Sequence, residues 1–271
     1  MTPARLRVHV LFEHGTDRQP FGSAWLRLLL PLDHPSTWSR IEARFVLDYD
    51  GGPTDVVLVD RLWRPDLDRV AVEGLARRTT AAGARLIVAI DDNFADLALE
   101  HPDWADSERW AAFELLLASA DGLVVTTDAL ARRYAPHSAR IEVVPNALDE
   151  RLLARGWRRS ATERLAEARS MADGTNRPVT IGYMGTYTHA SDLRLVAPAL
   201  EAVSRRHGEG VRIQLLGVAS EADAVDALAG IPHELVHPDH RQALYPLFLP
   251  WFLRRFRWDI ALAPLRDTPF N

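Results

Sequence analysis

The stretch Pro178–Gly217 decides the fold: PVTIGYMGTYTHASDLRLVAPALEAVSRRHGEGVRIQLLG. It opens on the apolar run Val179–Met184, continues through a helical pattern over Asp192–His207 and closes on a second apolar run, Val211–Gly217. Two short apolar runs joined by a helical segment of this length are typical of parallel strands connected by a crossover helix. The stretch therefore predicts one unit of a parallel α/β sheet with helices on both faces.

The same rhythm extends outward in both directions. Beyond this stretch, the C-terminal part predicts strands at Glu234–Val236 and Ile260–Ala263, and helices at Glu221–Leu228 and Gln242–Arg255. Towards the N-terminus, six apolar runs predict further strands, at Leu6–Phe12, Ile41–Leu47, Asp55–Asp60, Arg85–Ile90, Gly122–Thr126 and Ile141–Pro145. Helical patterns lie between these runs, at Gly22–Leu32, Pro65–Ala82, Asp106–Ala120 and, with Thr127 as N-cap, around Leu130 and Tyr134.

Composition excludes several functions. Of the 271 residues, 47% are hydrophobic and 25% are charged, which is the balance of a globular protein. The formal net charge of −5 offers no basic surface to a nucleic-acid backbone, so no nucleic-acid partner is expected. The absence of cysteine excludes disulfides and thiolate metal ligands and favours a cytoplasmic setting. We find neither a signal peptide nor an apolar run of the ~20 residues that span a bilayer.

Two domains are expected from the change of character along the chain. Residues 1–149 predict an N-terminal Rossmann-like domain. Residues 150–177 hold few strand formers and many Arg, Ala and Glu, which predicts a linker that includes a helix. Residues 178–271 predict a second Rossmann-like domain. We expect this second domain to be incomplete, because a doubly wound domain normally continues with helices after its last strand.

The apolar segment Leu244–Phe256 has two interpretations. Its leucine, phenylalanine and tryptophan content favours a helix of the core. The alternative is a surface that contacts lipid or a partner protein, which would place the chain at the inner face of a membrane as a peripheral protein.

Loops that follow strands are the candidate sites, because ligands of open α/β sheets bind at the carboxyl ends of the strands. Gly185 permits close approach of the backbone to a ligand, and the helix that follows offers unpaired N–H groups to a diphosphate. The equivalent turn of the first domain is Gly22-Ser23, with Arg27 one turn into its helix. Arg27 is placed to reach an anion or, alternatively, to form a salt bridge in solvent. Either glycine turn also fits an ordinary strand-to-helix connection.

Two carboxylates, Asp91 and Asp92, come directly after the strand Arg85–Ile90 and are followed by Asn93. Adjacent carboxylates repel each other, which tends to raise the pKa of one of them, as a catalytic base requires. Ionised carboxylates also accept several hydrogen bonds from a hydroxyl-rich acceptor. The alternative is a helix N-cap with an acidic first turn. We favour a functional role.

Three histidines, His233, His237 and His240, lie close to Asp239 in the sequence. They fall across a predicted strand and its loop, so their side chains need not converge, and we expect no metal site here.

Four groups of segments resemble glycosyltransferase family 4, especially bacterial enzymes that build polysaccharides and glycoconjugates. They are Ala120–Thr127 with Val143–Asp149, Ile181–Thr186 with His189 and Asp192-Leu193, Asp259–Asn271 (DIALAPLRDTPFN), and Pro20–Pro31 with Ile90–Asn93. The sequence departs from the family at Asn146-Ala147, where Asn-Gly is usual, and at Asn93, where a third aspartate is common. Relatives also continue beyond the motif that here ends at Asn271, so we expect a truncated second domain.

This resemblance implies a GT-B fold and a transferase. The implied reaction moves a sugar, of the hexosyl type, from a nucleotide-sugar to a glycan, lipid-linked or other hydroxyl acceptor. It proceeds with retention and needs no metal or cofactor beyond the nucleotide-sugar co-substrate. The implied roles are catalysis for Asp91 and Asp92, binding on the acceptor or phosphate side for Gly22, Ser23 and Arg27, and donor binding for Gly185, Thr186, His189, Asp192 and Asn271.

Two other classes of function fit the same pattern. A non-catalytic, truncated GT-B module would bind a nucleotide, a glycan or a protein partner without turnover. A two-domain α/β enzyme such as a nucleotide-sugar epimerase would also use a cleft between its sheets.

Overall fold

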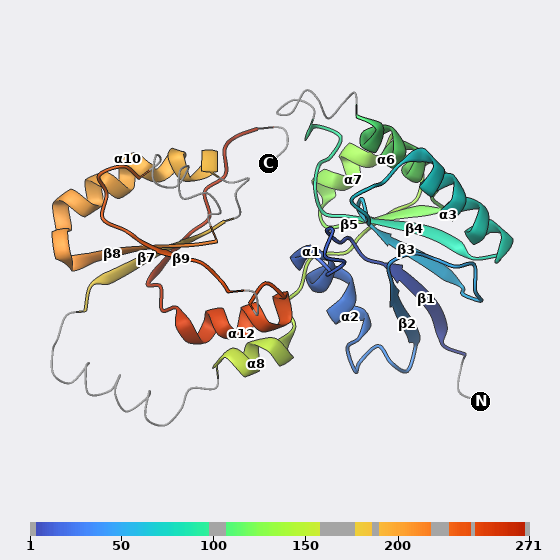
Figure 1. The fold of residues 1–271 in the computed structure, drawn as a ribbon, viewed down its shortest axis with the longest axis horizontal. Coiled ribbons are helices and arrows are strands. Elements are labelled where there is room, and N and C mark those ends of the chain that lie inside the picture. The colour runs from blue at the N-terminus through green and yellow to red at the C-terminus, as the bar shows by residue number, and fades with distance from the viewer. Residues whose placement is uncertain are drawn as a thin grey trace. The chain divides into compact units, whose positions relative to one another are not determined.

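The computed structural model describes residues 4–97, 107–157, 177–185, 190–217, 228–239 and 242–268. The chain divides into two compact units, with the boundary between Asp149 and Glu150. Each unit is built on its own parallel sheet, one of six strands and one of four (Figure 1). The predicted α/β class with two Rossmann-like sheets is thus confirmed.

The first unit contains a six-stranded sheet in the order β2-β1-β3-β4-β5-β6, in which every neighbouring pair is parallel. The strands are β1 (Leu6–Leu11), β2 (Ile41–Val46), β3 (Val56–Asp60), β4 (Arg85–Ile90), β5 (Gly122–Val125) and β6 (Ile141–Val143). The chain runs from β1 outward to β2 and then returns to the other side of β1 as β3. The order of the strands therefore reverses between β1 and β3.

Helices cover both faces of this sheet (Figure 1). They are α1 (Gly22–Ala24), the π-helical turn η1 (Trp25–Leu29), α2 (Leu30–Leu32), α3 (Arg69–Ala81), α6 (Glu108–Ser119) and α7 (Asp128–Tyr134). Strand β1 shows why two cores form. Val8, Val10 and Phe12 pack with Leu28 on one face, whereas Leu11 joins the core on the opposite face, because successive side chains of a strand point to opposite sides.

Side-chain caps set where the helices of the first unit begin. The side chains of Asp68 and Ser107 accept hydrogen bonds from the backbone N–H groups of Ala71 (2.7 Å) and Trp110 (3.1 Å). Helices α3 and α6 accordingly begin after these residues, later than the expected starts at residues 65 and 106. The predicted N-cap Thr127 is confirmed, since its hydroxyl accepts a hydrogen bond from the N–H of Leu130.

The second unit contains a four-stranded parallel sheet in the order β10-β7-β8-β9. Its elements are α8 (Glu150–Trp157), β7 (Val179–Met184), α10 (Ala190–His207), η3 (Gly208–Gly210), β8 (Val211–Leu216), β9 (Glu234–Val236), α12 (Tyr245–Arg255) and β10 (Ile260–Leu262). Helices α10 and α12 lie on opposite sides of the sheet (Figure 1). The helix expected at 221–228 lies outside the described residues.

Helix α12 is attached to the sheet through aromatic contacts. Phe252 packs against Phe256 and Trp258, with ring centroids 5.3 and 5.0 Å apart. Trp258 in turn lies against β7, where a Cβ atom on Gly182 would come within 1.8 Å of the indole ring. Within α12 only Pro250 is fully buried, so the segment is an attached helix with a half-exposed face. No helix among the described residues is long and apolar enough to cross a membrane.

Candidate functional site

The carboxyl ends of three neighbouring strands, β1, β3 and β4, bring charged residues together. Glu13 follows β1 by two residues, Asp60 ends β3 and is followed by Arg61, and Asp91 directly follows β4. The reversal of strand order between β1 and β3 falls within this group. Such reversal points open a crevice at the carboxyl edge of the sheet, which is where α/β proteins bind ligands. We call the set the charge cluster, and its members are Glu13, Arg27, Asp60, Arg61, Asp91, Asp92 and Arg109.

Arg61 is the centre of the charge cluster. Its guanidinium lies 2.6 Å from Glu13 Oε2, 3.3 Å from Asp91 Oδ1 and 2.9 Å from Asp92 Oδ2. The guanidinium also stacks over the ring of Phe94, 5.4 Å from its centroid. These carboxylates raise the pKa of Arg61 above its already high ordinary value. Arg61 therefore holds the loops after β1 and β4 to the end of β3.

Arg27 approaches the same carboxylates from the π-helical turn. Its guanidinium lies 3.3 Å from Asp91 Oδ1 and 3.9 Å from Asp60 Oδ1, and only 4% of its side chain is exposed. The alternative of a salt bridge in solvent is therefore wrong, because the carboxylates that Arg27 faces are themselves buried, with 0% of Asp60 and 14% of Asp91 exposed. Single π-helical turns are frequent at functional sites.

Burial raises the pKa of two carboxyl groups in the cluster. Asp60 is fully buried, and this burial raises its pKa to about 7. Burial also raises the pKa of Glu13, against the opposing effect of Arg61. Asp60 Oδ2 accepts a hydrogen bond from the Glu13 backbone N–H at 3.1 Å, which ties the loop after β1 to the end of β3. Carboxyl groups with raised pKa values in a crevice are frequent at catalytic sites.

Strained backbone supports the cluster. Arg61 and Trp63 have φ angles of +48° and +22°, a region that side-chain-bearing residues rarely adopt. Trp63 is fully buried. The buried hydroxyl of Tyr134 donates to the Asp92 carbonyl and accepts from the Phe94 N–H, both at 3.1 Å, and so anchors the loop after β4. Strain of this kind persists only where the surroundings enforce it, and it concentrates at functional sites.

Asp91, Asp92 and Arg27 were predicted from the sequence as site residues, and the structure brings them together. Glu13, Asp60 and Arg61 were not predicted, although all three stand at or just after the end of an expected strand, the rule that pointed to Asp91. Gly22 and Ser23 begin the helix that carries Arg27, and a Cβ on Gly22 would meet open space. The turn therefore does not require glycine for steric reasons.

The second sheet has its own reversal point, between β10 and β7. Gly185 follows β7, and its N–H donates to the Leu216 carbonyl at 3.1 Å. A Cβ on Gly185 would come within 2.7 Å of the Tyr183 hydroxyl oxygen, and a Cβ on Gly217 within 3.0 Å of the Gly185 carbonyl. Gly217 thus lets the end of β8 approach the end of β7 closely, whereas Gly185 leaves space for the Tyr183 ring of the preceding strand. The predicted donor residues Thr186, His189 and Asn271 lie outside the described residues.

Asp192 is buried in the first turn of α10. Its Oδ1 accepts a hydrogen bond from the Arg266 N–H at 3.1 Å and lies 3.4 Å from Arg266 Nε. The carboxylate thereby ties the segment after β10 to the beginning of α10. Asp192 and Gly185 are both at the carboxyl edge of the second sheet, as predicted, and Asp192 orders the loop there.

Among the described residues, no group of three or more His, Asp or Glu side chains could hold a metal ion. His233 is turned to its own loop, with Nδ1 2.8 Å from the Ile231 carbonyl oxygen. His240 lies outside the described residues.

Comparisons with known proteins gave likeness only among solved structures. No family model and no curated protein matches the chain. A UDP-forming trehalose-phosphate synthase from Burkholderia xenovorans is 14% identical, with a TM-score of 0.47 over 80% of this chain and 54% of that one. Arabidopsis thaliana UGT89C1 in complex with UDP-L-rhamnose is 14% identical, with a TM-score of 0.41 over 88% of this chain and 70% of that one. A Neisseria meningitidis UDP-GlcNAc 2-epimerase bound to UDP-GlcNAc is 11% identical, with a TM-score of 0.45 over 90% of this chain and 75% of that one.

The chain spans about half the length of the trehalose-phosphate synthases it matches. Because identities and TM-scores are this low, the two parallel sheets of the chain itself carry the fold assignment.

Proposed function

We propose that the protein is a nucleotide-sugar-dependent glycosyltransferase of the GT-B type, which transfers a sugar of the hexosyl type to a hydroxyl group of a glycan or lipid-linked acceptor. The proposed reaction retains the anomeric configuration and uses no metal. The observation that carries the proposal is the buried charge cluster at the reversal point of the first sheet. The proposed reaction at this site is inferred from the resemblance of four groups of segments to glycosyltransferase family 4.

The first unit is proposed to bind the acceptor. Its three arginines already face carboxylates, so the cluster has little positive charge left for a phosphate. Ionised carboxylates instead accept hydrogen bonds from hydroxyl groups. Asp92 is the member open to such a ligand, with 42% of its side chain exposed. The cluster therefore favours a hydroxyl-rich acceptor.

The second unit is proposed to bind the donor. Gly185 permits close approach of a ligand to the backbone that follows β7, and the amino end of α10 directs its backbone N–H groups and the positive end of the helix dipole towards a diphosphate. Asp192 holds the loop after β10 beside that helix end through Arg266. Thr186, His189 and Asn271 are assigned to the same donor site from the sequence resemblance.

The proposed chemistry needs two kinds of stabilisation. The departing diphosphate gains negative charge, which fixed N–H groups at a helix end stabilise without a metal ion. The sugar gains positive charge, which carboxylates stabilise. In this scheme Arg27 and Arg61 are positioning residues that hold Asp91 and Asp92 in place.

The sharpest test is Asp92→Asn, compared with Asp55→Asn. Both carboxylates pair with an arginine at similar distance, 2.9 Å for Asp92 with Arg61 and 2.8 Å for Asp55 with Arg7, and 37% of the Asp55 side chain is exposed. Asp55 precedes β3 and so lies at the opposite, amino edge of the sheet. We expect Asp92→Asn to lower transfer by about 100-fold or more, whereas Asp55→Asn retains it.

The assay follows release of the nucleoside diphosphate from a panel of nucleotide-sugars with glycan acceptors. Equal activity of the two variants would contradict the role of the cluster. Thermal stabilisation by a nucleotide-sugar without any transfer would identify a non-catalytic binding module. Conversion of the nucleotide-sugar itself, without an acceptor, would identify an epimerase.

A further inference from the structure

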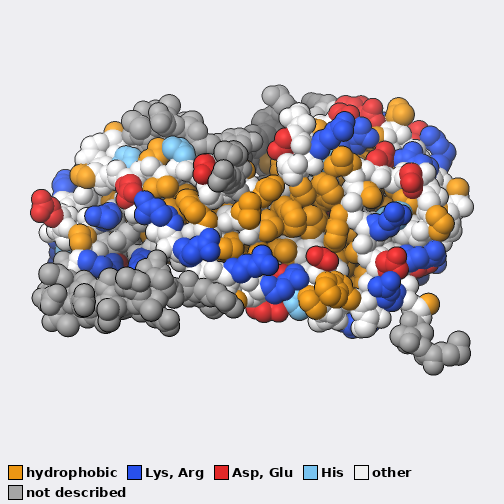
Figure 2. Space-filling view, turned by 60° about the horizontal axis from the view of Figure 1, so that its bottom comes forward, with side chains coloured by type: hydrophobic (Ala, Val, Ile, Leu, Met, Phe, Trp, Pro, Cys, Tyr) orange, Lys and Arg blue, Asp and Glu red, His pale blue; other side chains and the backbone are white. Residues whose placement is uncertain are grey.

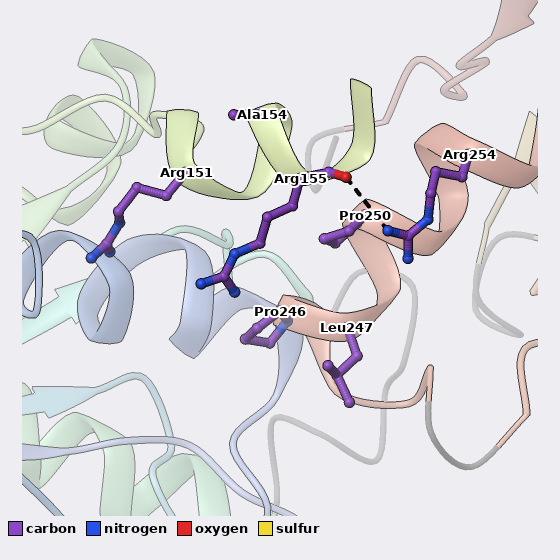
Figure 3. A pocket seen from close by; sticks show the side chains of 7 residues that line it. All are labelled: Arg151, Ala154, Arg155, Pro246, Leu247, Pro250 and Arg254. Carbon is purple, nitrogen blue, oxygen red and sulfur yellow. Dashed lines mark hydrogen bonds between the residues drawn. The ribbon is translucent and has the colours of Figure 1, made fainter. Parts of the chain in front are cut away.

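A basic pocket in the second unit lies between α8 and α12. It has a volume of about 640 Å³ and is lined by Arg151, Ala154, Arg155, Pro246, Leu247, Pro250 and Arg254. Three of these seven side chains are arginines, the other four are apolar, and none is acidic. Figure 3 shows Arg151 and Arg155 extending from α8 on the same side, with Pro246 and Pro250 of α12 next to Arg155.

Close packing of the two helices fixes the shape of the pocket. A Cβ on Gly156 would lie 2.6 Å from the Cβ of Leu253, so only glycine permits this approach of α8 to α12. Arg254 donates from a guanidinium nitrogen to the Arg155 carbonyl at 3.4 Å, and this contact joins the helices beside the pocket (Figure 3). The arginines therefore stand on a packed pair of helices.

The guanidinium groups of Arg155 and Arg254 have no carboxylate partner among the described residues. Both residues are exposed. An arginine guanidinium offers a planar fork of donors that matches phosphate. Two guanidinium groups beside apolar lining residues suit a ligand that carries a phosphate group on an apolar molecule.

Apolar side chains beside the arginines indicate a lipid surface as the source of that phosphate. Leu247 lines the pocket and is 52% exposed. Figure 2 shows hydrophobic and basic side chains next to one another on this face of the molecule. Helices that lie on membranes combine an apolar face with flanking arginines in this way, and anionic headgroups attract the arginines.

We propose that the α8–α12 pocket binds the phosphate of an anionic phospholipid and so docks the second unit on an anionic membrane surface. The site is independent of the charge cluster and of the transfer reaction. It gives one interpretation of the apolar segment Leu244–Phe256 a defined location and chemistry, with Arg155 of α8 added to Arg254 of the segment itself.

The test is binding of the full chain to vesicles of phosphatidylcholine with and without phosphatidylglycerol, measured by co-sedimentation. The variant carries Arg155→Glu and Arg254→Glu. The control carries Arg205→Glu and Arg206→Glu, two exposed arginines of α10. We expect the first variant to lower binding to anionic vesicles at least tenfold, since each arginine near such a surface contributes roughly fivefold. The control should stay within about twofold of the unchanged protein.

Leu247→Ser is a second variant that leaves the arginines in place, and we expect weaker binding to the same vesicles. Thermal unfolding of each variant shows whether the helix pair is retained, and Arg155→Gln with Arg254→Gln replaces any variant that unfolds. Equal loss in variant and control, or equal binding to both vesicle types, would overturn the proposal. Stabilisation by inorganic phosphate without vesicle binding would also overturn it, because the ligand would then be a free phosphate.

Discussion

The loops at the carboxyl edges of the two sheets are held in place by different interactions. In the first unit, Glu13 and Asp60 are buried with Arg61 and Arg27, and charge holds the loops together. In the second unit, Gly217 lets the ends of β7 and β8 approach, and one buried carboxylate orders the neighbouring loop. Charged side chains dominate the first edge, whereas glycine and backbone groups are prominent in the described part of the second. Under the proposed function, the first edge binds a hydroxyl-rich acceptor and the second binds the diphosphate of the donor.

The largest expected effect is on the stability of the first unit, and it follows from the removal of Arg61. Arg61→Ala leaves Glu13 as a buried carboxylate without its closest counter-charge. Breaking a buried ion pair by removing one partner typically costs about 3–5 kcal/mol, and we expect a loss of this size in the free energy of unfolding, measured with urea.

Arg64→Ala is the matched control for this measurement. Arg64 also follows β3 and pairs with a carboxylate, Asp66, at 2.7 Å, but 70% of the Asp66 side chain is exposed. Exposed pairs contribute about 0–1 kcal/mol. If both substitutions cost the same, the charge cluster does not hold the first edge together, and the contrast with the second unit fails.

The second prediction concerns pH. Asp60 has a pKa of about 7 in the folded chain and an ordinary value of 3.8. Between these values the folded chain keeps a proton that the unfolded chain has released. The contribution of Asp60 to the free energy of unfolding therefore falls as pH rises from about 4 to about 7, by at most ~1.4 kcal/mol per pH unit, and it is fully present only below pH 4.

Asp60→Asn isolates this effect, because an amide oxygen still accepts the hydrogen bond from Glu13 and the side chain no longer titrates. We expect the unfolding free energy of the variant, relative to the unchanged protein, to rise with pH over the same window. Urea unfolding at several pH values measures it. A difference that stays constant with pH would show that Asp60 is ionised throughout and that burial does not govern this edge.

The sequence predicted the strands of both sheets to within one or two residues because apolar runs between polar loops are local signals. It also predicted the helix at residues 22–32, but the π-helical turn within it depends on how Arg27 and Leu28 pack against the sheet. The later starts of α3 and α6 follow from caps at Asp68 and Ser107, and both residue types are visible in the sequence.

The site was less predictable than the fold. Asp91 and Asp92 were found because they are adjacent and follow a strand. Asp60 ends its strand and looks like an ordinary boundary residue, and only the parallel pairing of β3 with β1 and β4 shows that it is buried among charges. The pocket between α8 and α12 joins residues about 100 positions apart, which no periodicity within one segment indicates.

The smallest expected effect comes from added side-chain volume within the sheet of the second unit. Gly182 lies in the middle of β7, where a Cβ atom would overlap the ring of Trp258. Trp258 is also held by a hydrogen bond from its indole N–H to Gln214 Oε1 at 3.0 Å. Gly182→Ala must displace this ring, and overpacking of this kind costs about 1–3 kcal/mol of unfolding free energy.

Gly210→Ala is the control, because a Cβ at Gly210 would have no atom within 4 Å. A double variant, Gly182→Ala with Trp258→Leu, separates steric overlap from the loss of glycine itself. If overlap is the cause, the alanine costs less once the indole is gone, and the two substitutions are non-additive in urea unfolding. Strict additivity would mean that Trp258 does not rest on β7.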